Sequence, residues 1–162
     1  LLQQVISDLY AQINKKNQSI SLESANIQLV AHPLSIHLLM VNLISNANKY
    51  TPEGGEIKVS TAVISDNLGN EQLSIIVEDS GKGISPSEYS RVFDRFYRVG
   101  GDQHNSNVVG CGLGLAIVKH IADVHGAIIT LSSSLALKGL QIKVTFPSRI
   151  TKAKTIITNN TL

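Results

Sequence analysis

An acidic residue followed by two glycines forms the first segment of this chain that could do chemistry. The segment is 79–84 (Asp-Ser-Gly-Lys-Gly-Ile), directly after an expected strand. The Asp79 carboxylate can accept a hydrogen bond from the amino group of a purine, and Gly81 and Gly83 leave room for a base to approach the backbone. A plain turn between a strand and a helix is the alternative interpretation, because short glycine motifs often arise by chance.

A second glycine-rich segment, 110–115 (Gly-Cys-Gly-Leu-Gly-Leu), precedes an expected amphipathic helix. Glycines in this position let backbone N–H groups point at phosphate oxygens, and the helix dipole favours the anion. The spacing G-x-G-x-G after a polar loop does not fit a Rossmann dinucleotide site. A P-loop is excluded as well, because Gly81-Lys82 is followed by Gly83 instead of Ser or Thr.

Two amides and an amine lie on one face of an expected helix, since Asn42, Asn46 and Lys49 are spaced at i, i+4 and i+7. An amide oxygen suits Mg²⁺, which commonly keeps waters and phosphate oxygens as its other ligands. Lys49 could then contact phosphate. Helix capping and ordinary surface polarity are the alternative, and these residues favour a site only together with the two glycine segments.

Aromatic residues and arginines are mixed in a fourth segment, 93–98 (Phe-Asp-Arg-Phe-Tyr-Arg). We expect a short helix that places Phe93 or Phe96 in the core. The following residues, 99–110, carry Gly, Asp, Asn and Ser with little apolar content, so we expect them to be mobile.

In chain order, the four segments are 42–50, 79–84, 93–98 and 110–115. They resemble the N, G1, F and G2 boxes of the ATP-binding domain of sensor histidine kinases. The wider family includes the Hsp90, gyrase B and MutL ATPase domains, and the resemblance covers about residues 28–147. It implies ATP and Mg²⁺ as cofactors, with Asn46 at the metal. The nucleotide-binding residues that it implies are Asn42, Asn46, Lys49, Tyr50, Asp79, Gly81, Gly83, Ile84, Tyr97, Arg98, Gly110, Gly112, Leu113, Gly114 and Leu115.

The same resemblance implies a role in two-component phosphorelay signalling. Tyr97 and Arg98 would lie at the base of a flexible lid over the phosphates, formed by residues 99–110. The γ-phosphate of ATP would be presented to a histidine on a dimerisation domain and would pass to an aspartate of a response regulator. The acceptor histidine of this family is followed by an acidic residue, and none of the five histidines here is. We therefore expect the acceptor to lie outside this chain, and no self-phosphorylation.

Two other functions compete with this interpretation. An ATP-hydrolysing clamp of the Hsp90 or MutL kind needs a catalytic acid on the helix of the first box. The corresponding position here is Asn42, and residues 33–52 contain no Asp or Glu. The non-enzymatic alternative is a degenerate module that binds nucleotide or a partner without phosphoryl transfer. The four intact segments argue against it.

Apolar residues at helical spacing over residues 1–16 predict an amphipathic helix, which either packs on its own domain or ends an upstream dimerisation domain. Residues 17–147 would form the ATP-binding domain. We expect disorder in the Thr- and Asn-rich tail, 148–162. Within the domain, strands are predicted at 18–22, 27–31, 57–64, 73–78, 127–131 and 140–146, and helices at 33–50 and 113–124. Ser85, Pro86 and Glu88 predict a short capped helix.

The expected fold is α/β: a two-layer sandwich of a mixed, mostly antiparallel sheet with about three helices on one face, because elements with one apolar face pack in layers. The resemblance implies the same Bergerat-type ATP-binding fold, with nucleotide between the helices and the lid.

The composition suits a single domain with a core, with 162 residues, of which 43% are hydrophobic and 16% charged. A net charge of +2 and an aromatic content of 4% argue against nucleic acid as a partner. No apolar run is long enough to cross a bilayer. We expect a cytoplasmic domain of an inner-membrane sensor, attached to the membrane only through upstream segments.

The single cysteine, Cys111, excludes an internal disulfide framework and fits a reducing compartment. It lies between two glycines at the start of the helix 113–124, where backbone N–H groups favour the thiolate. We expect an accessible, reactive thiol; a buried small apolar residue is the alternative.

Overall fold

A computed structural model describes residues 1–24, 27–99, 111–148 and 151–153 of the chain. Apart from the short helix expected at 93–98, the elements predicted from the sequence are present, with small shifts of their bounds. In chain order they are α1 (Leu2–Asn14), β1 (Ser19–Glu23), β2 (Ile27–Leu29), α2 (Pro33–Tyr50), β3 (Glu56–Ser65), β4 (Glu71–Asp79), the 3-10 helix η1 (Pro86–Glu88), α3 (Gly114–His125), β5 (Ile128–Ser133), β6 (Leu140–Phe146) and β7 (Thr151–Ala153).

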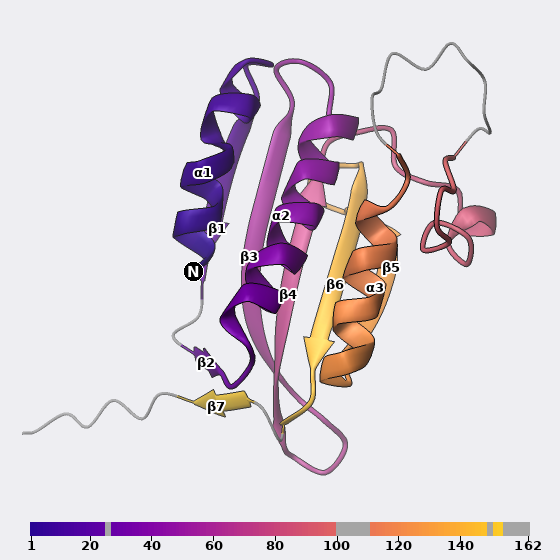
Figure 1. Cartoon of the computed structure of the whole chain (residues 1–162). Helices are drawn as coiled ribbons and strands as arrows, with labels where there is room; N and C mark the ends of the chain where they lie inside the picture. The colour runs from indigo at the N-terminus through magenta and orange to yellow at the C-terminus, as the bar shows by residue number, and fades with distance from the viewer. Residues whose placement is uncertain (25–26, 100–110, 149–150, 154–162) are drawn as a thin grey trace, which may run out of the picture.

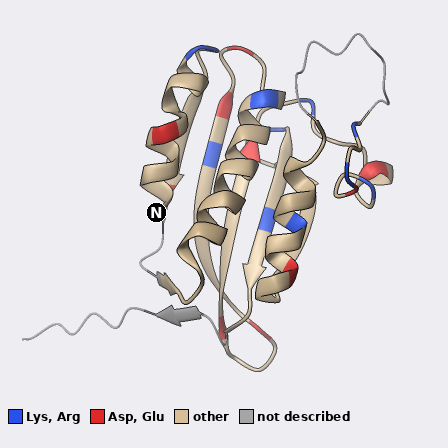
Figure 2. Cartoon of the chain, in the orientation of Figure 1, with Lys and Arg blue, Asp and Glu red and all other residues tan. Residues whose placement is uncertain are grey.

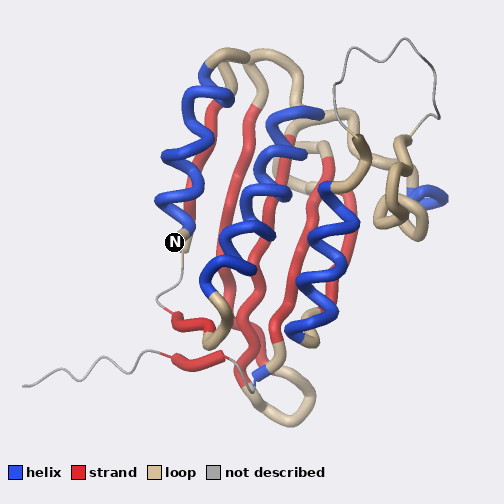
Figure 3. The backbone as a smooth tube through the Cα atoms, in the orientation of Figure 1, coloured by secondary structure: helices blue, strands red, loops and turns tan. Residues whose placement is uncertain are grey.

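Five of these strands form one sheet in the order β1-β3-β4-β6-β5. β1 pairs in parallel with β3, whereas the pairs β3–β4, β4–β6 and β5–β6 are antiparallel. The three α-helices lie side by side over one face of this sheet (Figures 1 and 3). The predicted two-layer sandwich with a mixed, mostly antiparallel sheet is confirmed.

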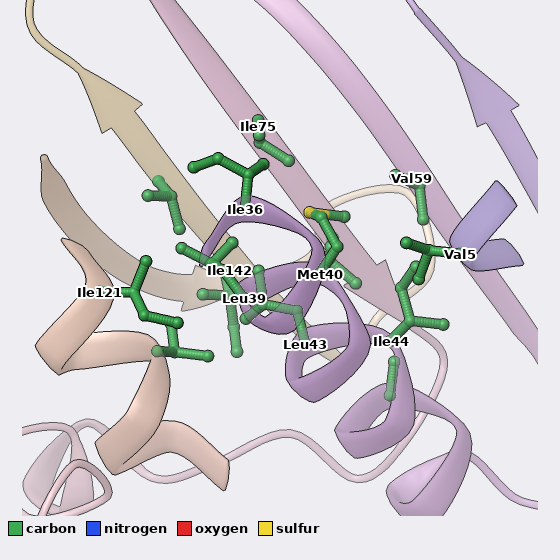
Figure 4. Close-up of a cluster of buried hydrophobic side chains, with 14 of the residues drawn as sticks. Val5, Ile36, Leu39, Met40, Leu43, Ile44, Val59, Ile75, Ile121 and Ile142 are labelled. Carbon is green, nitrogen blue, oxygen red and sulfur yellow. The ribbon is translucent and has the colours of Figure 1, made fainter. Parts of the chain in front are cut away.

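The core lies between the helices and the sheet. Alternate residues of β6, from Leu140 to Phe146, are buried, as expected for a strand with one covered face. On α2, Leu39, Met40 and Leu43 are at most 1% exposed, and Figure 4 shows them among the other buried side chains of the core. Each buried side chain of this size stabilises the fold by about 1.5–3 kcal/mol. This packing fixes α2 and α3 on the sheet, and with them the residues that face the space between the two helices.

The N-terminal helix α1 contributes to the same core. Val5, Leu9 and Ile13, at helical spacing, are buried. Figure 4 shows Val5 beside Ile44 of α2 and Val59 of β3. The apolar face of α1 thus packs on the sheet and α2.

The C-terminal segment departs from the expected disorder at residues 151–153. These residues form β7, which pairs antiparallel with β2 through the register Ile27↔Ala153 to Leu29↔Thr151. Strand pairing uses backbone groups and needs no apolar pattern, so composition alone could not reveal it. Residues 154–162 lie outside the described part of the chain.

The segment after β4 also differs from its prediction. Ser85 does not cap η1 with its side chain; its Oγ is hydrogen-bonded to Ser87 Oγ at 2.9 Å. Turns replace the short helix expected at 93–98. Phe96 is 68% exposed and Phe93 is half-buried, so neither is a core residue; Val92 is buried in their place. The cause is local, because Phe96 has a φ of +64°, which bends the chain away from a helix.

Candidate nucleotide-binding site

A cavity lies between α2, β4, β6, the start of α3 and the segment 82–99, with about 780 Å³ of atom-free space that is partly open to solvent. It brings together residues from all four predicted segments. The predicted site residues that line it are Asn46, Tyr50, Asp79, Gly83, Ile84, Tyr97, Arg98 and Leu115. The predicted residues Asn42, Lys49, Gly81, Gly112, Leu113 and Gly114 are outside this lining, and Gly110 lies outside the described residues.

Asp79 ends β4 at the floor of the cavity and is 7% exposed. Its Oδ1 accepts hydrogen bonds from the backbone N–H groups of Gly81 (2.8 Å) and Leu140 (3.2 Å). No described residue donates to Oδ2. Burial raises the pKa of this carboxyl above its ordinary value, and the two N–H groups partly oppose the rise. The carboxyl is thus fixed through one oxygen, and the other can accept a bond from a ligand.

Two glycines allow the backbone to close around Asp79. A Cβ on Gly81 would lie 2.6 Å from the backbone oxygen of Tyr50, and a Cβ on Gly139 would lie 2.2 Å from that of Asp79. Any side chain at either position would displace backbone. Gly139 was not predicted as a site residue. It is a single glycine in the connection between β5 and β6, and nothing in the nearby sequence relates it to Asp79.

The walls beside Asp79 are apolar. Leu43 and Ala47 of α2, Val77 of β4, and Leu140 and Ile142 of β6 line the cavity there. None of these residues was predicted as part of the site. One carboxylate among apolar walls provides a single polar contact and a dry surface, which suits a planar base with an amino group.

Asn42 and Asn46 of α2 face the start of α3. A Cβ on Gly114 would lie 3.2 Å from Asn42 Oδ1 and 3.5 Å from both polar atoms of the Asn46 amide. Asn42 donates through Nδ2 to the Leu38 oxygen at 2.8 Å, as a helical residue can to the preceding turn. The two amides predicted to share a helix face thus meet the second glycine segment.

Backbone N–H groups in the first turn of an α-helix have no partner within the helix. In α3 no side chain at Leu113 caps them, so they can bind a ligand. Gly112, with a φ of +71°, packs closely on the Phe96 backbone. The Phe96 N–H donates to the Gly112 oxygen at 3.0 Å. This bond joins the two chain ends that flank residues 100–110, which lie outside the described part.

Two charged side chains contact Tyr97. Its hydroxyl donates to Glu88, and the Arg91 guanidinium lies 4.4 Å from the ring centroid. Arg98, the next residue, lines the cavity. Glu88, the acid expected in the first turn of η1, lies there and also accepts this bond from Tyr97.

A lysine that was not predicted as a site residue lies at the cavity. Lys82 is exposed and lines the cavity, whereas Lys49 lies over the Tyr50 ring, 5.1 Å from the centroid. Lys82 lies within the 79–84 motif, but its neighbours in the sequence did not predict that it would line the cavity.

Asn46 could hold Mg²⁺ through its amide oxygen, since it lies beside the N-terminal end of α3, where backbone N–H groups would favour phosphate. Among the described residues, no group of three or more His, Cys, Asp or Glu is placed to hold a metal ion. A metal here would take its remaining ligands from phosphate and water.

The family model of histidine kinase-, DNA gyrase B- and HSP90-like ATPases matches residues 31–150. The chain belongs to this family. It is 33% identical over 147 residues to the sensor protein kinase PmrB of Pseudomonas aeruginosa, covering 91% of this chain and 29% of that protein. It is 44% identical over 106 residues to the sensor histidine kinase WalK of Bacillus subtilis, covering 65% of this chain and 16% of that protein. The chain thus spans less than a third of the length of these relatives.

Solved structures show the same fold. The mycobacterial sensor histidine kinase MprB superimposes with a TM-score of 0.72 at 25% identity, over 90% of this chain and 93% of that one. The full-length kinase ShkA, in complex with AMPPNP, has a TM-score of 0.72 at 24% identity, over 90% of this chain and 29% of that one. The chain corresponds to the catalytic domain of sensor histidine kinases. In the described residues, none of the helices has the length and apolar character needed to cross a bilayer.

Proposed function

We propose that this histidine-kinase domain binds ATP with Mg²⁺ and presents the γ-phosphate to a histidine on a dimerisation domain of the same protein. The phosphate would then pass to an aspartate of a response regulator. The observation that carries the proposal is the single cavity that joins Asp79, Asn46, Arg98 and the start of α3.

The adenine would lie on the Asp79 side, with its amino group donating to the free carboxylate oxygen. The phosphates would extend towards the start of α3, where backbone N–H groups and the helix dipole favour anions. This orientation is supported by the apolar walls near Asp79 and by the polar groups near Gly114.

Asn46 would hold Mg²⁺ through its amide oxygen, and the ion would supply charge neutralisation at the phosphates. Arg98 and Lys49 would add positive charge, and Lys82 is placed to do the same. These residues orient the nucleotide, since phosphoryl transfer depends mainly on positioning and electrostatic stabilisation. The acceptor histidine would come from the dimerisation domain, which is consistent with the five unsuited histidines of this chain.

The parent protein would be an inner-membrane sensor with this domain in the cytoplasm. The relatives that carry the same domain are named as sensor kinases and are far longer than this chain.

Incubation with γ-labelled ATP tests the proposal. The chain alone should bind ATP and remain unlabelled, and a matching histidine-bearing dimerisation domain should acquire acid-labile label when it is added. Label on this chain that disappears when one of its own histidines is replaced would overturn the assignment, as would failure to bind ATP with Mg²⁺.

A further inference from the structure

The turn after α1 is bonded to the C-terminal end of α2. Lys16 Nζ donates hydrogen bonds to the backbone oxygens of Asn48 (2.7 Å), Lys49 (3.3 Å) and Thr51 (2.6 Å). The last carbonyl groups of an α-helix have no partner within the helix and carry its negative dipole end. Lys16 therefore supplies both donors and a compensating charge from outside α2. Figure 2 shows the basic turn after α1 at the same end of the molecule as the C-terminal end of α2.

Gln18, the residue before β1, reinforces this contact. Its Nε2 donates to the backbone oxygens of Asn48 (3.1 Å), Thr51 (2.7 Å) and Pro52 (3.2 Å). Gln18 is 6% exposed and Thr51 is 1% exposed. Water cannot readily replace hydrogen bonds at such buried positions, so loss of these donors would leave carbonyl groups without partners.

The other side of the same helix end contacts the nucleotide site. Tyr50 lines the cavity, and its backbone oxygen lies against Gly81 so closely that a Cβ there would be 2.6 Å away. The Gly81 N–H in turn donates to Asp79 Oδ1. The last turn of α2 is therefore held between the turn after α1 and the turn that fixes Asp79.

A second connection runs parallel to the first. The Gly54 N–H donates to the Lys16 oxygen at 2.9 Å, and the Ser19 N–H donates to the Gly55 oxygen at 3.0 Å. Next to Gly55, the Glu56 N–H donates to Ser80 Oγ at 2.8 Å, and the Ser80 N–H donates to the Glu56 oxygen at 3.0 Å. Ser80 lies between Asp79 and Gly81, so this connection reaches the same turn.

We propose that Lys16 and Gln18 are positioning residues of the nucleotide site. They hold the last turn of α2 against residues 79–81 and so fix the distance between Tyr50 and Asp79. Neither side chain touches the cavity, and each acts through backbone groups of α2. The proposal rests on ATP binding as proposed above, and it makes the end of α1 a determinant of nucleotide affinity.

The test compares Lys16→Met with Lys15→Met in the full 162-residue chain. Lys15 is the exposed neighbour, so its variant loses the same charge without a bond to α2. Calorimetry should show ATP binding about fivefold to tenfold weaker in Lys16→Met and unchanged in Lys15→Met, as expected for lost charged hydrogen bonds. Lys16→Arg, which keeps donors and charge, should recover most of the affinity.

Two further measurements separate positioning from a loss of stability. Val5→Ala removes a buried side chain of α1 and should lower the urea midpoint at least as much, yet leave the ATP dissociation constant of the folded protein unchanged. In ¹⁵N–¹H spectra without nucleotide, Lys16→Met should shift the amide signals of Gly81 and Leu140, which report on Asp79. Val5→Ala should leave both signals in place.

The outcomes distinguish this proposal from the proposed function. If the parent binds ATP and Lys16→Met binds it equally well with unshifted Gly81 and Leu140 signals, the positioning role is wrong and ATP binding stands. If Val5→Ala weakens binding as much as Lys16→Met, the effect is stability alone and the positioning role is again wrong. If the parent does not bind ATP, the proposed function fails, and the amide shifts alone decide whether Lys16 positions residues 79–81.

Discussion

The two ends of the cavity are built in different ways. At the base end, Asp79 is buried and holds two backbone N–H groups, and Gly81 and Gly139 are packed against backbone. At the phosphate end, the Asn46 amide makes no hydrogen bond to any described residue, and Lys82 is exposed. Folding alone therefore completes the base end, whereas Asn46 and Lys82 at the phosphate end are left for solvent or a ligand.

This difference predicts which measurements respond to substitution. Changes at the base end should alter both stability and nucleotide binding, because the same contacts serve the fold and the ligand. Changes at the phosphate end should alter binding with little effect on stability, because polar groups that bond to water contribute little to the fold.

The largest effect is expected for Gly139→Ala. The new Cβ would lie 2.2 Å from the Asp79 oxygen and 2.5 Å from Asp79 Oδ1, so the floor of the cavity must move. We expect ATP binding to be lost and the free energy of unfolding to fall by about 2–3 kcal/mol, as for overpacked cores, measured by calorimetry and urea titration.

Gly69→Ala is the control for this change. Gly69 has a φ of +80° but nothing within 4 Å of an added Cβ, so Ala there adds only backbone strain of about 1–2 kcal/mol. ATP binding should be retained. Equal binding by Gly139→Ala and the parent would show that the base end tolerates displacement and would remove the contrast between the two ends.

Asp79→Asn should weaken ATP binding by about 1.5–3 kcal/mol, the usual contribution of a hydrogen bond to a charged group. An amide can present a donor to the adenine amino group, where an acceptor is needed. Asp123→Asn, on the exposed side of α3, is the matched control and should bind as the parent does. If calorimetry finds the same affinity for Asp79→Asn, Asp79 does not contact the base.

The same pair of proteins should differ in pH dependence. Burial raises the pKa of Asp79 above its ordinary value of 3.8. At a pH between 3.8 and the raised pKa, Asp79 therefore holds a proton in the folded protein that it has released in the unfolded chain. Stability therefore falls as the pH rises through this interval. Asp79→Asn lacks this titration, and in urea titrations its stability relative to the parent should improve as the pH rises above 3.8. A relative stability that is constant or declines would contradict the raised pKa.

The comparison between the two ends also explains what the sequence could predict. Short segments with chemically distinctive residue types contain Asp79, Asn46 and the glycines before α3, and these types predict a nucleotide site. Gly139 is distant from Asp79 in the chain, and only the pairing of β4 with β6 brings them together. Long-range contacts of this kind leave no local pattern, so the sequence identified the carboxylate but not the glycine that accommodates it.

Local backbone geometry limited the prediction elsewhere. The pattern at 93–98 predicts a helix with a buried phenylalanine, but the positive φ of Phe96 and its bond to Gly112 override that preference. Lys49 was predicted as a phosphate contact and Lys82 was not, because the direction of each side chain depends on its neighbours in the fold. Element types were predictable because their hydrophobic period is local.

At the phosphate end, Asn46→Ala should weaken ATP binding about fivefold to tenfold with Mg²⁺ and have little effect in EDTA, because the amide acts through the metal. The urea midpoint should change little. Asn14→Ala, an exposed helical control, should alter neither affinity. An equal loss of binding with and without Mg²⁺ would assign Asn46 to the nucleotide itself.

The smallest effect concerns Cys111, which is exposed and free, so the expected accessibility is confirmed. It precedes Gly112 and the start of α3, where the phosphates would lie, and it is the only cysteine of the chain. Saturating ATP–Mg²⁺ should therefore slow alkylation by a small maleimide about twofold to fivefold, because bound phosphate repels the thiolate and covers the loop. Mass spectrometry of the single adduct measures the rate, and Asn46→Ala supplies the control, since it should need more ATP for the same protection. A rate that saturating nucleotide leaves unchanged would separate Cys111 from the phosphates.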